Sequence, residues 1–577
     1  MLTASLRTLA FAGLSLVAPS ALATTFYVDA NLTTGLNDGS SWANAFQSSG
    51  GLQRALLATS SGDEVYVAQG TYLPTTTGSR GASFQLQNGV EIYGGFLGGE
   101  VSPAERPPFG TAPSILTGDL LGNDGSNLFN DNSFHVVNAA NTNATAILDG
   151  FTVERGNANS GGNNNRGAGI LCIGSASPTV RNCFFFLHRS TFGGAAGYIN
   201  GSAPRFLDCT FQGGIGGSFG GAFDIATAGA VRFERCVFRG NRAARAGALE
   251  VFATAGVVVS ECVFFNNVAT GTAGGGAVWV GAGANVQFRG NTVVGNTSSN
   301  SAFAGLRVDG ATTSVGNCIF WDNTGQGAQN SINQISGTGA TYCIVEGGLG
   351  GAGNLATAPT FVDLPGRDLA LVDGSAGIDA GNNSLIPSGI TLDATGNARR
   401  SDAPTVSDTG AGSSPVVDMG AFEFTAPGFP SFCDASDNAL VSCPCANPGN
   451  ADSGCDIQQA TGGVVLEVIA QESGAQNRVT LTGSGYPASS MPSSIVIRGT
   501  TLEANPVVFG DGLRCVGIPL VRLAGTFAFL GQATHTFGHG TMAGVGDFHY
   551  QLWFRNTPAM YCTPDAFNLS NGRTLTW

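Results

Sequence analysis

The chain has 577 residues, of which 11% are charged, and a formal net charge of −14 at pH 7. All 25 basic residues are arginines, which excludes Schiff-base and general-base chemistry by lysine. Because the overall balance is acidic and the arginines form no basic cluster, nucleic acid is not an expected partner. The 87 glycines and the few charges favour a turn-rich chain of about two to four domains.

Residues 1–23 have the order of a secretory signal peptide. Arg7 precedes the apolar stretch Leu9–Val17, and Ala21 and Ala23 form a small-residue cleavage site. A membrane anchor is the alternative, but the apolar stretch is shorter than the ~20 residues that a spanning helix needs. We expect cleavage after Ala23 and an exported protein, secreted or at the cell surface. Its mature chain would have no transmembrane segment and could form disulfides.

The phrase VVVSECVFFNN, residues 257–267, recurs about every 26 residues. Aligning its copies defines a Cys column of Cys183, Cys209, Cys236, Cys262, Asn291, Cys318 and Cys343. The residue two positions later is always Phe or Val, which is the period-2 pattern of a strand with one buried face. Because Asn tolerates left-handed backbone and its amides can stack, the Asn column five positions after the Cys column predicts a turn at Asn241, Asn267, Asn296 and Asn323.

Each repeat also has a second apolar strand, predicted at 221–225, 247–251, 276–280 and 304–308. A third apolar position lies three residues before the Cys column, and this odd offset implies a bend between it and the Cys-column strand. Two or three short strands per repeat, each stacked on its counterpart one repeat later, predict an all-β, right-handed parallel β-helix. A β-propeller is the alternative, but its blades need ~40 residues and four strands.

A repeating cysteine can indicate disulfides, a metal site or core packing. Rungs of a β-helix lie ~4.8 Å apart, which formally allows a bridge between neighbours. However, side chains on in-register parallel strands point the same way, and the column also accepts Phe151 and Asn291. We therefore favour buried, reduced thiols that pack as small hydrophobic side chains.

The outward position of the second strand gives the best candidate for catalysis. It places Asp224, Glu250, Trp279 and Arg307 on successive rungs, a set that we call the acidic row. Two carboxylates one rung apart could approach the ~5 Å separation of a retaining glycosidase, and Trp279 could stack on a sugar ring. A solvated face with scattered charges is the simpler interpretation, and we favour it.

A second outward row, the apolar row, holds Arg239, Phe265, Val294 and Trp321. It is unusually apolar for a free surface, so it predicts either a binding face or a covering loop, and we favour the loop. Under the binding interpretation, the aromatic side chains of both rows would contact carbohydrate: Trp279, Trp321 and Phe265.

Phrases from Thr25 to Phe424 resemble one known family. They include FYVDANLTTGLNDGSSWANAFQ, SGDEVYVAQGTYLPT, FQLQNGVEIYGGFLGGE, LVDGSAGIDAGNNS, TLDATGNARR and VVDMGAFEF. In this order they are similar to secreted β-helix proteins of the choice-of-anchor Q type. The resemblance implies a pectin-lyase-like fold over residues 24–426 with a closing segment at its end. It also implies an exported, surface-associated protein with no assigned reaction.

Residues 427–577 predict a separate β-sandwich-like domain. Apolar runs such as GGVVLEVIA and SSIVIRG read as strands, and the later part resembles a C-terminal module of large exported bacterial proteins. Six cysteines argue for up to three disulfides, with the pairing left open: Cys433, Cys443, Cys445, Cys455, Cys515 and Cys562. Zinc is the alternative, but the Cys443-Pro444-Cys445 spacing lacks the two-residue gap of a zinc knuckle.

Other motifs for chemistry are weak or missing. The sequence contains no nucleophile elbow, phosphate loop or dinucleotide fingerprint, and the HTFGH motif with His535 and His539 lacks the glutamate of a zinc protease. Acidic loops at Asn37, Gly118 and Asp434 could bind Ca²⁺, but turns rich in Asp, Asn and Gly look much the same without metal, and we favour structural turns. We expect no other cofactor.

These observations predict a noncatalytic structural or adhesin-like protein whose partner is extracellular polysaccharide or the cell envelope. The alternative is a polysaccharide lyase or glycoside hydrolase that uses Asp224, Glu250 and Arg307.

Overall fold

The computed structural model describes residues 23–577 apart from 253–255, 273, 311, 328–330, 404–405, 425–430, 434–441, 445–448, 451–452, 457–460, 473–477, 487–491, 530, 539–545, 556–566 and 577. The predicted signal peptide therefore lies outside the described residues, except for Ala23. The chain divides into two compact units, Met1–Thr425 and Ala426–Trp577. Within the described ranges, no helix is long and apolar enough to cross a membrane.

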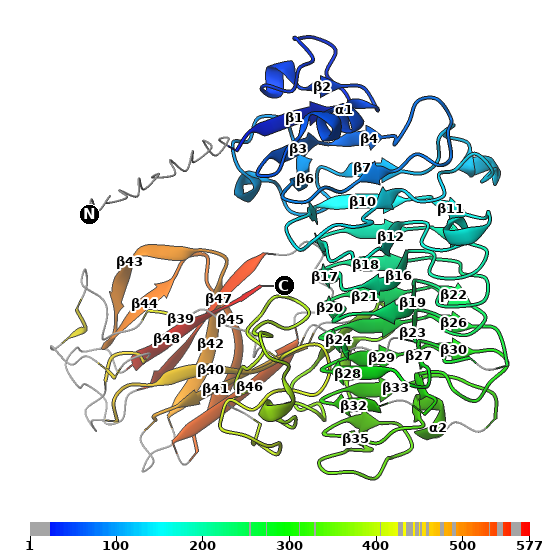
Figure 1. The fold of residues 1–577 in the computed structure, drawn as a ribbon. Coiled ribbons are helices and arrows are strands. Elements are labelled where there is room, and N and C mark those ends of the chain that lie inside the picture. The colour runs from blue at the N-terminus through cyan, green and yellow to red at the C-terminus, as the bar shows by residue number, and fades with distance from the viewer. Residues whose placement is uncertain are drawn as a thin grey trace, which may run out of the picture. The chain divides into compact units, whose positions relative to one another are not determined.

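Three long parallel sheets form the first unit, and their strands stack rung upon rung (Figure 1). Sheet A comprises β1 (Thr25–Asp29), β2 (Phe46–Gln47), β3 (Glu64–Ala68), β6 (Glu91–Phe96), β9 (Ile147–Asp149), β13 (Thr179–Arg181), β17 (Arg205–Leu207), β20 (Arg232–Glu234), β24 (Gly256–Ser260), β28 (Asn285–Arg289), β32 (Thr312–Gly316) and β35 (Ala340–Thr341). Sheet B, which follows the Cys column, comprises β4 (Gly70–Tyr72), β7 (Ser114–Thr117), β10 (Phe151–Glu154), β14 (Phe184–Phe186), β18 (Thr210–Gln212), β21 (Val237–Arg239), β25 (Val263–Phe265), β29 (Thr292–Val294), β33 (Ile319–Trp321) and β36 (Ile344–Val345).

Sheet C contains the predicted second strand of each repeat. It comprises β5 (Phe84–Gln85), β8 (Val137–Asn138), β12 (Ile170–Ile173), β16 (Gly197–Ser202), β19 (Phe223–Ala228), β23 (Leu249–Val251), β27 (Val278–Val280), β31 (Leu306–Val308) and β34 (Ile335–Ser336). Shorter sheets join β11 (Asn157–Ala158) to β15 (Arg189–Ser190), β22 (Arg242–Ala243) through β26 (Val268–Ala269) to β30 (Thr297–Ser298), and β37 (Phe361–Asp363) to β38 (Asp368–Leu371).

Helices are few in the described part of the first unit. The α-helices are α1 (Gly51–Ala58) and α2 (Ser331–Gln334), and the short 3-10 helices are η1 (Trp42–Asn44), η2 (Pro103–Glu105), η3 (Asp124–Ser126), η4 (Gly162–Asn165) and η5 (Asn383–Leu385). Helix α1 buries Leu52, Ala55 and Leu56 in the same core as the first rungs. It therefore caps a solenoid whose end rung would otherwise expose apolar side chains to water.

Stacked side chains fill the interior of the solenoid. On sheet B, the Phe238 ring lies 5.0 Å from that of Phe211 and 4.6 Å from that of Phe264. On sheet A, Phe206 and Phe233 stack at 5.1 Å. In-register parallel pairing places each ring over its counterpart one repeat later. Burying each ring contributes about 1.5–3 kcal/mol, so the repeated Phe positions add substantially to stability.

The predicted bend lies immediately before the Cys column. The residues at this position have positive φ angles of 51–59°: Asn182, Asp208, Arg235, Glu261, Gly290, Asn317 and Tyr342. A left-handed residue there turns the chain sharply from sheet A into sheet B. This geometry accounts for the odd offset between the two apolar positions in the sequence.

The Asn column forms a buried amide ladder. Asn241 donates through both its backbone N–H and its Nδ2 to Oδ1 of Asn267, at 3.1 and 3.0 Å. Asn267 bonds to Asn296 in the same way, and Asn296 to Asn323. The left-handed residue is one position earlier than predicted, for example Asn266 with φ 54°. Because the Asn side chains must point inward to pair, the preceding residue makes the turn.

The Cys-column thiols are buried and free: Cys183, Cys209, Cys236, Cys262, Cys318 and Cys343. The sulfur atoms of the column can accept hydrogen bonds from the neighbouring rung. For example, the backbone N–H of Cys236 donates to Cys262 Sγ at 3.4 Å. Asn291 has the same role, since its Oδ1 accepts the N–H of Cys262 at 2.9 Å. This shared acceptor role explains why Asn can replace Cys in the column. Burial raises the pKa of the Cys262 thiol, which favours its neutral form.

Thiol counting on the denatured, unreduced full chain tests the state of these cysteines. We expect at least seven free thiols, because Cys172 is also buried and free alongside the six of the Cys column. Nine are expected if Cys445 and Cys562, which lie outside the described residues, are unpaired. Reaction with an aromatic disulfide reagent in denaturant gives the count. Fewer than seven free thiols would mean that the column is oxidised.

The second unit is a separate antiparallel β domain. Its five-stranded sheet contains β39 (Ser431–Phe432), β48 (Phe567–Thr576), β47 (Asp547–Arg555), β42 (Ser493–Gly499) and β45 (Val521–Phe527). A three-stranded sheet contains β40 (Val465–Glu472), β41 (Arg478–Ser484) and β46 (Gln532–Gly538), and a hairpin joins β43 (Leu502–Phe509) to β44 (Gly512–Val516). Both larger sheets contribute to one buried core, with Leu466 and Leu481 from one and Tyr550 and Leu552 from the other. This shared core is typical of a β-sandwich.

Two disulfides link the second unit, Cys433–Cys515 and Cys443–Cys455. The prediction of disulfides is therefore confirmed for four of the six candidate cysteines. Because Cys443 is paired with Cys455, the zinc alternative is wrong for this residue. Cys445 and Cys562 lie outside the described residues.

Candidate functional site

The acidic row forms one line across sheet C. Register pairs Asp224 with Glu250, Glu250 with Trp279, and Trp279 with Arg307, so the four residues occupy successive rungs on β19, β23, β27 and β31. Strand alternation places their neighbours Phe223, Leu249, Val278 and Leu306 in the core. The four side chains therefore lie on the outer side of the sheet.

The expectation of a solvated face for this row is wrong. Asp224 is 1% exposed, Glu250 0% and Trp279 6%, and only Arg307 is partly exposed. Side chains from the loops that precede the sheet C strands, and from the end of β23, cover the row: Arg166, Phe192, Phe219, Arg245 and Phe252. These loops differ from repeat to repeat in sequence, so the repeat pattern gave no sign of the cover.

Arginines from these loops neutralise both carboxylates. Arg166 Nη1 lies 2.9 Å from Asp224 Oδ2, and Arg245 Nη1 lies 3.1 Å from Glu250 Oε1. The backbone N–H of Gly220 also donates to Glu250 Oε2 at 3.1 Å. Burial raises the pKa of Asp224 to about 6 and that of Glu250 to about 8, although both arginines lower these values. The two carboxyls are therefore buried members of a charge-paired stack.

Aromatic rings complete this stack around Arg245. Its guanidinium lies 4.6 Å from the ring of Phe219, 4.7 Å from that of Trp279 and 5.2 Å from that of Phe252. Trp279 donates from Nε1 to Asp309 Oδ2 at 3.0 Å. A sugar would have to displace these partners to reach Trp279, so stacking of a glycan on this ring is not supported.

The arrangement also limits what the acidic row can do chemically. A general acid or nucleophile must contact the reacting bond. Asp224 and Glu250 instead contact Arg166 and Arg245, and the remaining member, Arg307, forms a 2.9 Å ion pair with Asp309. The ion pairs of the row therefore connect successive loops to sheet C, which is a structural role.

The apolar row is covered by the closing segment of the same unit. Phe265 is 8% exposed and Val294 is fully buried, while Trp321 is partly exposed. A separate apolar cluster packs on them, including Phe361, Leu369, Leu371, Ile378, Met419, Ala421 and Phe424. The favoured interpretation of a covering segment agrees with this packing. Phe265 is consequently closed to carbohydrate.

A buried charge cluster joins the closing segment to the β-helix. Arg399 Nε lies 2.6 Å from Oε2 of Glu261, the left-handed residue beside Cys262, and its Nη1 pairs closely with Glu423. Burial raises the pKa of Glu261 to about 8, of Asp418 to about 7 and of Glu423 to about 9. Three carboxyls share one guanidinium, and their burial favours the protonated forms.

Sequence reasoning assigned no role to this cluster. Arg399, Asp418 and Glu423 stand in TLDATGNARR and VVDMGAFEF, which were used only for the family resemblance. A signal was present in VVDMGAFEF, because two acids within an otherwise apolar phrase indicate a paired buried site. Their partner Glu261 could not be found from spacing, since it lies 138 residues before Arg399 in the sequence.

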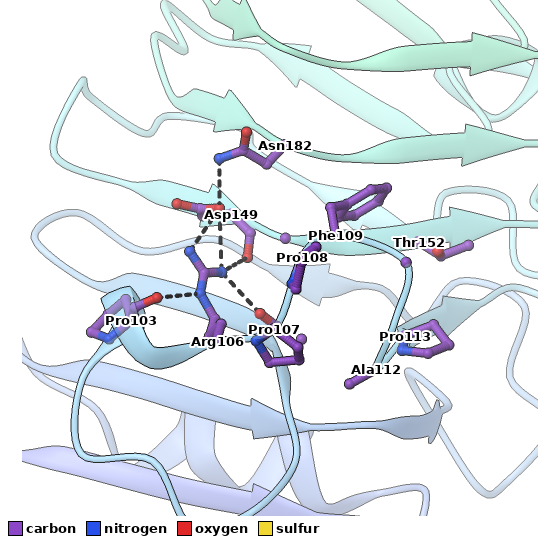
Figure 2. A pocket seen from close by; sticks show the side chains of 14 residues that line it. Pro103, Arg106, Pro107, Pro108, Phe109, Ala112, Pro113, Asp149, Thr152 and Asn182 are labelled. Carbon is purple, nitrogen blue, oxygen red and sulfur yellow. Dashed lines mark hydrogen bonds and ion pairs between the residues drawn. The ribbon is translucent and has the colours of Figure 1, made fainter. Parts of the chain in front are cut away.

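A pocket of about 200 Å³ lies beside the segment 103–113 and the turn that joins β9 to β10 (Figure 2). Arg106 points toward Asp149, with Nη2 3.4 Å from Oδ1, and Nη1 donates to Gly94 O at 2.9 Å. Arg181 Nε also lies 2.7 Å from Asp149 Oδ2. The charged groups of the pocket therefore satisfy one another, and the remaining lining is mostly Pro and Gly.

The predicted calcium loops are stabilised by their own hydrogen bonds. Asp38 Oδ1 accepts the N–H of Ser40 at 2.9 Å, and Asp119 accepts the N–H groups of Asn123 and Asp124 at 3.0 and 3.1 Å. Both are turns in which aspartate caps the backbone. The loop at Asp434 lies outside the described residues.

The histidines of the second unit have structural partners. His535 is buried against Ser494, with 3.1 Å between Nε2 and Oγ, and burial lowers its pKa to about 4. His549 Nδ1 lies 2.9 Å from Thr574 Oγ1. His539 lies outside the described residues.

Comparison with a family model agrees with the fold. A family model described as a right handed beta helix region matches residues 120–293. Among solved structures, the crystal structure of pectate lyase Pel9A aligns with 70% of this chain and 98% of its own length, at 15% sequence identity and a TM-score of 0.33. No curated protein matches the sequence. The family match and the three parallel sheets confirm the predicted right-handed β-helix.

Proposed function

We propose that this protein is an exported, noncatalytic β-helix of the choice-of-anchor Q type. It acts as a structural or adhesin-like element at the cell surface or in the extracellular matrix. The observation that carries the proposal is the closure of the acidic row, where Arg166 and Arg245 pair with the two carboxylates and aromatic rings cover them. The alternative, a lyase or hydrolase that uses Asp224, Glu250 and Arg307, needs these side chains to meet a substrate.

Several features support export and a role outside the cytoplasm. The first 23 residues have signal-peptide order, and the second unit contains two disulfides, which form in oxidising compartments. The buried charge cluster of Arg399 gives a physical role to phrases that carry the family resemblance. The partner would be extracellular polysaccharide or the cell envelope, and Trp321 is the one of the three aromatic candidates that is partly exposed.

Incubation of the full chain with acidic and neutral glycans, with and without Ca²⁺, tests the absence of catalysis. We expect neither new reducing ends nor unsaturated products above a heat-denatured control, because Glu250 is enclosed by Arg245 and Gly220. Reducing-sugar assays and absorbance of unsaturated uronates provide the measurement. Cleavage that disappears in Glu250→Gln but persists in Asp363→Asn, an exposed control, would overturn the proposal.

A further inference from the structure

Three aspartates of the closing segment meet at one place. Asp379, Asp402 and Asp408 each bring a carboxylate oxygen to within 4.8 Å of the other two. Asp379 is fully buried, whereas Asp402 and Asp408 are exposed. The cluster thus has one internal carboxylate and two that face solvent.

One oxygen of the buried Asp379 carboxylate has no hydrogen-bond partner within the described part of the chain. Asp379 Oδ1 is buried and accepts no hydrogen bond, while Oδ2 accepts the N–H of Ala403 at 3.2 Å. A buried carboxylate oxygen without a partner is costly, and such atoms in a native protein call for an explanation such as a bound ion. Burial and the two neighbouring carboxylates also raise the pKa of Asp379.

The two arginines nearest to Asp402 in sequence do not supply the missing charge. Arg399 pairs with Glu261 and Glu423. Arg400 donates to the backbone oxygens of Pro415 and Ser413. Among the described residues, neither arginine forms an ion pair with any of the three aspartates, and Asp402 Oδ1 accepts a hydrogen bond from Ser414 Oγ at 3.4 Å.

Backbone hydrogen bonds hold the cluster in place. Asp379 has a left-handed φ of 50°, and its N–H donates to Asp418 Oδ1 at 2.7 Å. Its carbonyl accepts the N–H of Thr409, next to Asp408, at 2.9 Å. Ala403, next to Asp402, donates to its side chain. Both exposed aspartates are therefore adjacent to residues tied directly to Asp379, which is the arrangement of a preorganised site.

We propose that Asp379, Asp402 and Asp408 bind a calcium ion. The donor set consists of carboxylate oxygens alone, which suits hard cations and disfavours zinc or copper. Calcium accepts irregular geometry with six to eight oxygens, and the exposed side leaves room for water ligands. Magnesium requires a near-ideal octahedron and loses its water ligands reluctantly, so it suits a site of three carboxylates less well. The ion would fix the loop that bears Asp402 and Asp408 to Asp379, beside the segment that covers sheet B.

Calcium titration of the EDTA-treated, dialysed full chain by isothermal calorimetry tests the proposal. We expect binding with a Kd of about 10⁻⁴ to 10⁻³ M or tighter, the range of extracellular modules. Asp402→Asn and Asp408→Asn should each weaken this site at least tenfold. Magnesium at the same concentrations should bind at least tenfold more weakly than calcium.

Asp368→Asn is the matched control, because Asp368 is an exposed aspartate of the same closing segment outside the cluster. It should bind calcium as the unaltered chain does, and circular dichroism of all variants checks that they fold. Both tested aspartates are exposed, so their replacement should preserve folding. Absence of calcium binding, or equal binding by Asp402→Asn, Asp408→Asn and the control, would overturn the proposal.

Discussion

Replacing Arg399 by methionine is expected to lower the free energy of unfolding of the β-helix by about 3–5 kcal/mol, the usual cost of breaking a buried ion pair from one side. Methionine keeps most of the length of the side chain, so the change removes the charge more than the packing. Glu261 and Glu423 would then remain buried without their cation. Urea unfolding of the full chain, followed by circular dichroism, gives the difference.

The loss should grow at alkaline pH. In the unaltered protein, burial raises the pKa of Glu261 to about 8 although Arg399 lowers it, so this carboxyl ionises in the folded protein only above about pH 8. Without Arg399, its pKa rises further, and the folded variant keeps a proton that the unaltered protein has lost. Each pH unit above about 8 then adds up to about 1.4 kcal/mol to the loss. Below pH 8, Glu261 takes up this proton on folding in both proteins, so it adds no pH dependence to the loss there.

Arg400→Met provides the matched control for this effect. Arg400 is the adjacent residue and is exposed, and its guanidinium donates to the backbone oxygens of Ser413 and Pro415. Its replacement should change stability by no more than about 0.5 kcal/mol. Equal stability of the Arg399 and Arg400 variants at pH 8 would contradict a role for the charge cluster in holding the closing segment.

The repeat made the solenoid predictable because each strand pairs in register with its counterpart one repeat later. The Cys column, the Phe positions and the bend before Cys262 all follow from a spacing of about 26 residues. The loops and the closing segment that cover the outer faces of the sheets follow no such spacing. Arg166 reaches Asp224 across 58 residues, and Arg399 reaches Glu261 from the closing segment. Period analysis alone therefore assigns residues to the outer side of a sheet without showing whether water reaches them.

For the acidic row, the outward position of the side chains was predictable, whereas their burial under loops was not. The sequence correctly placed Asp224 and Glu250 on adjacent rungs, but it favoured a solvated face, with catalysis as the alternative. Neither alternative included loops that carry arginines of their own. Arg166 and Arg245 in the loops between strands were the available signal, because an unpaired buried carboxylate is too costly to persist.

Asn267→Leu is expected to destabilise the β-helix by about 3 kcal/mol or more, because leaving each buried polar group without a hydrogen-bond partner costs about 1–3 kcal/mol. Asn267 is fully buried, and its Nδ2 donates to Phe238 O at 2.8 Å and to Asn296 Oδ1 at 2.9 Å. Its Oδ1 accepts two bonds from Asn241. Leucine has a similar volume but makes none of these bonds, so polar groups on the two neighbouring rungs lose partners together.

The damage should be local, because solenoid rungs contact mainly their neighbours. Hydrogen exchange should show faster exchange of the Asn241 N–H, whose acceptor is Asn267 Oδ1, while rungs near β12 keep their protection. Asn285→Ala, at an exposed position of β28, is the control and should change stability by no more than about 0.5 kcal/mol. A loss for Asn267→Leu as small as that of the control would mean that side-chain packing alone determines the Asn column. A larger loss would identify the amide ladder as a second source of rung-to-rung cohesion beside the stacked Phe rings.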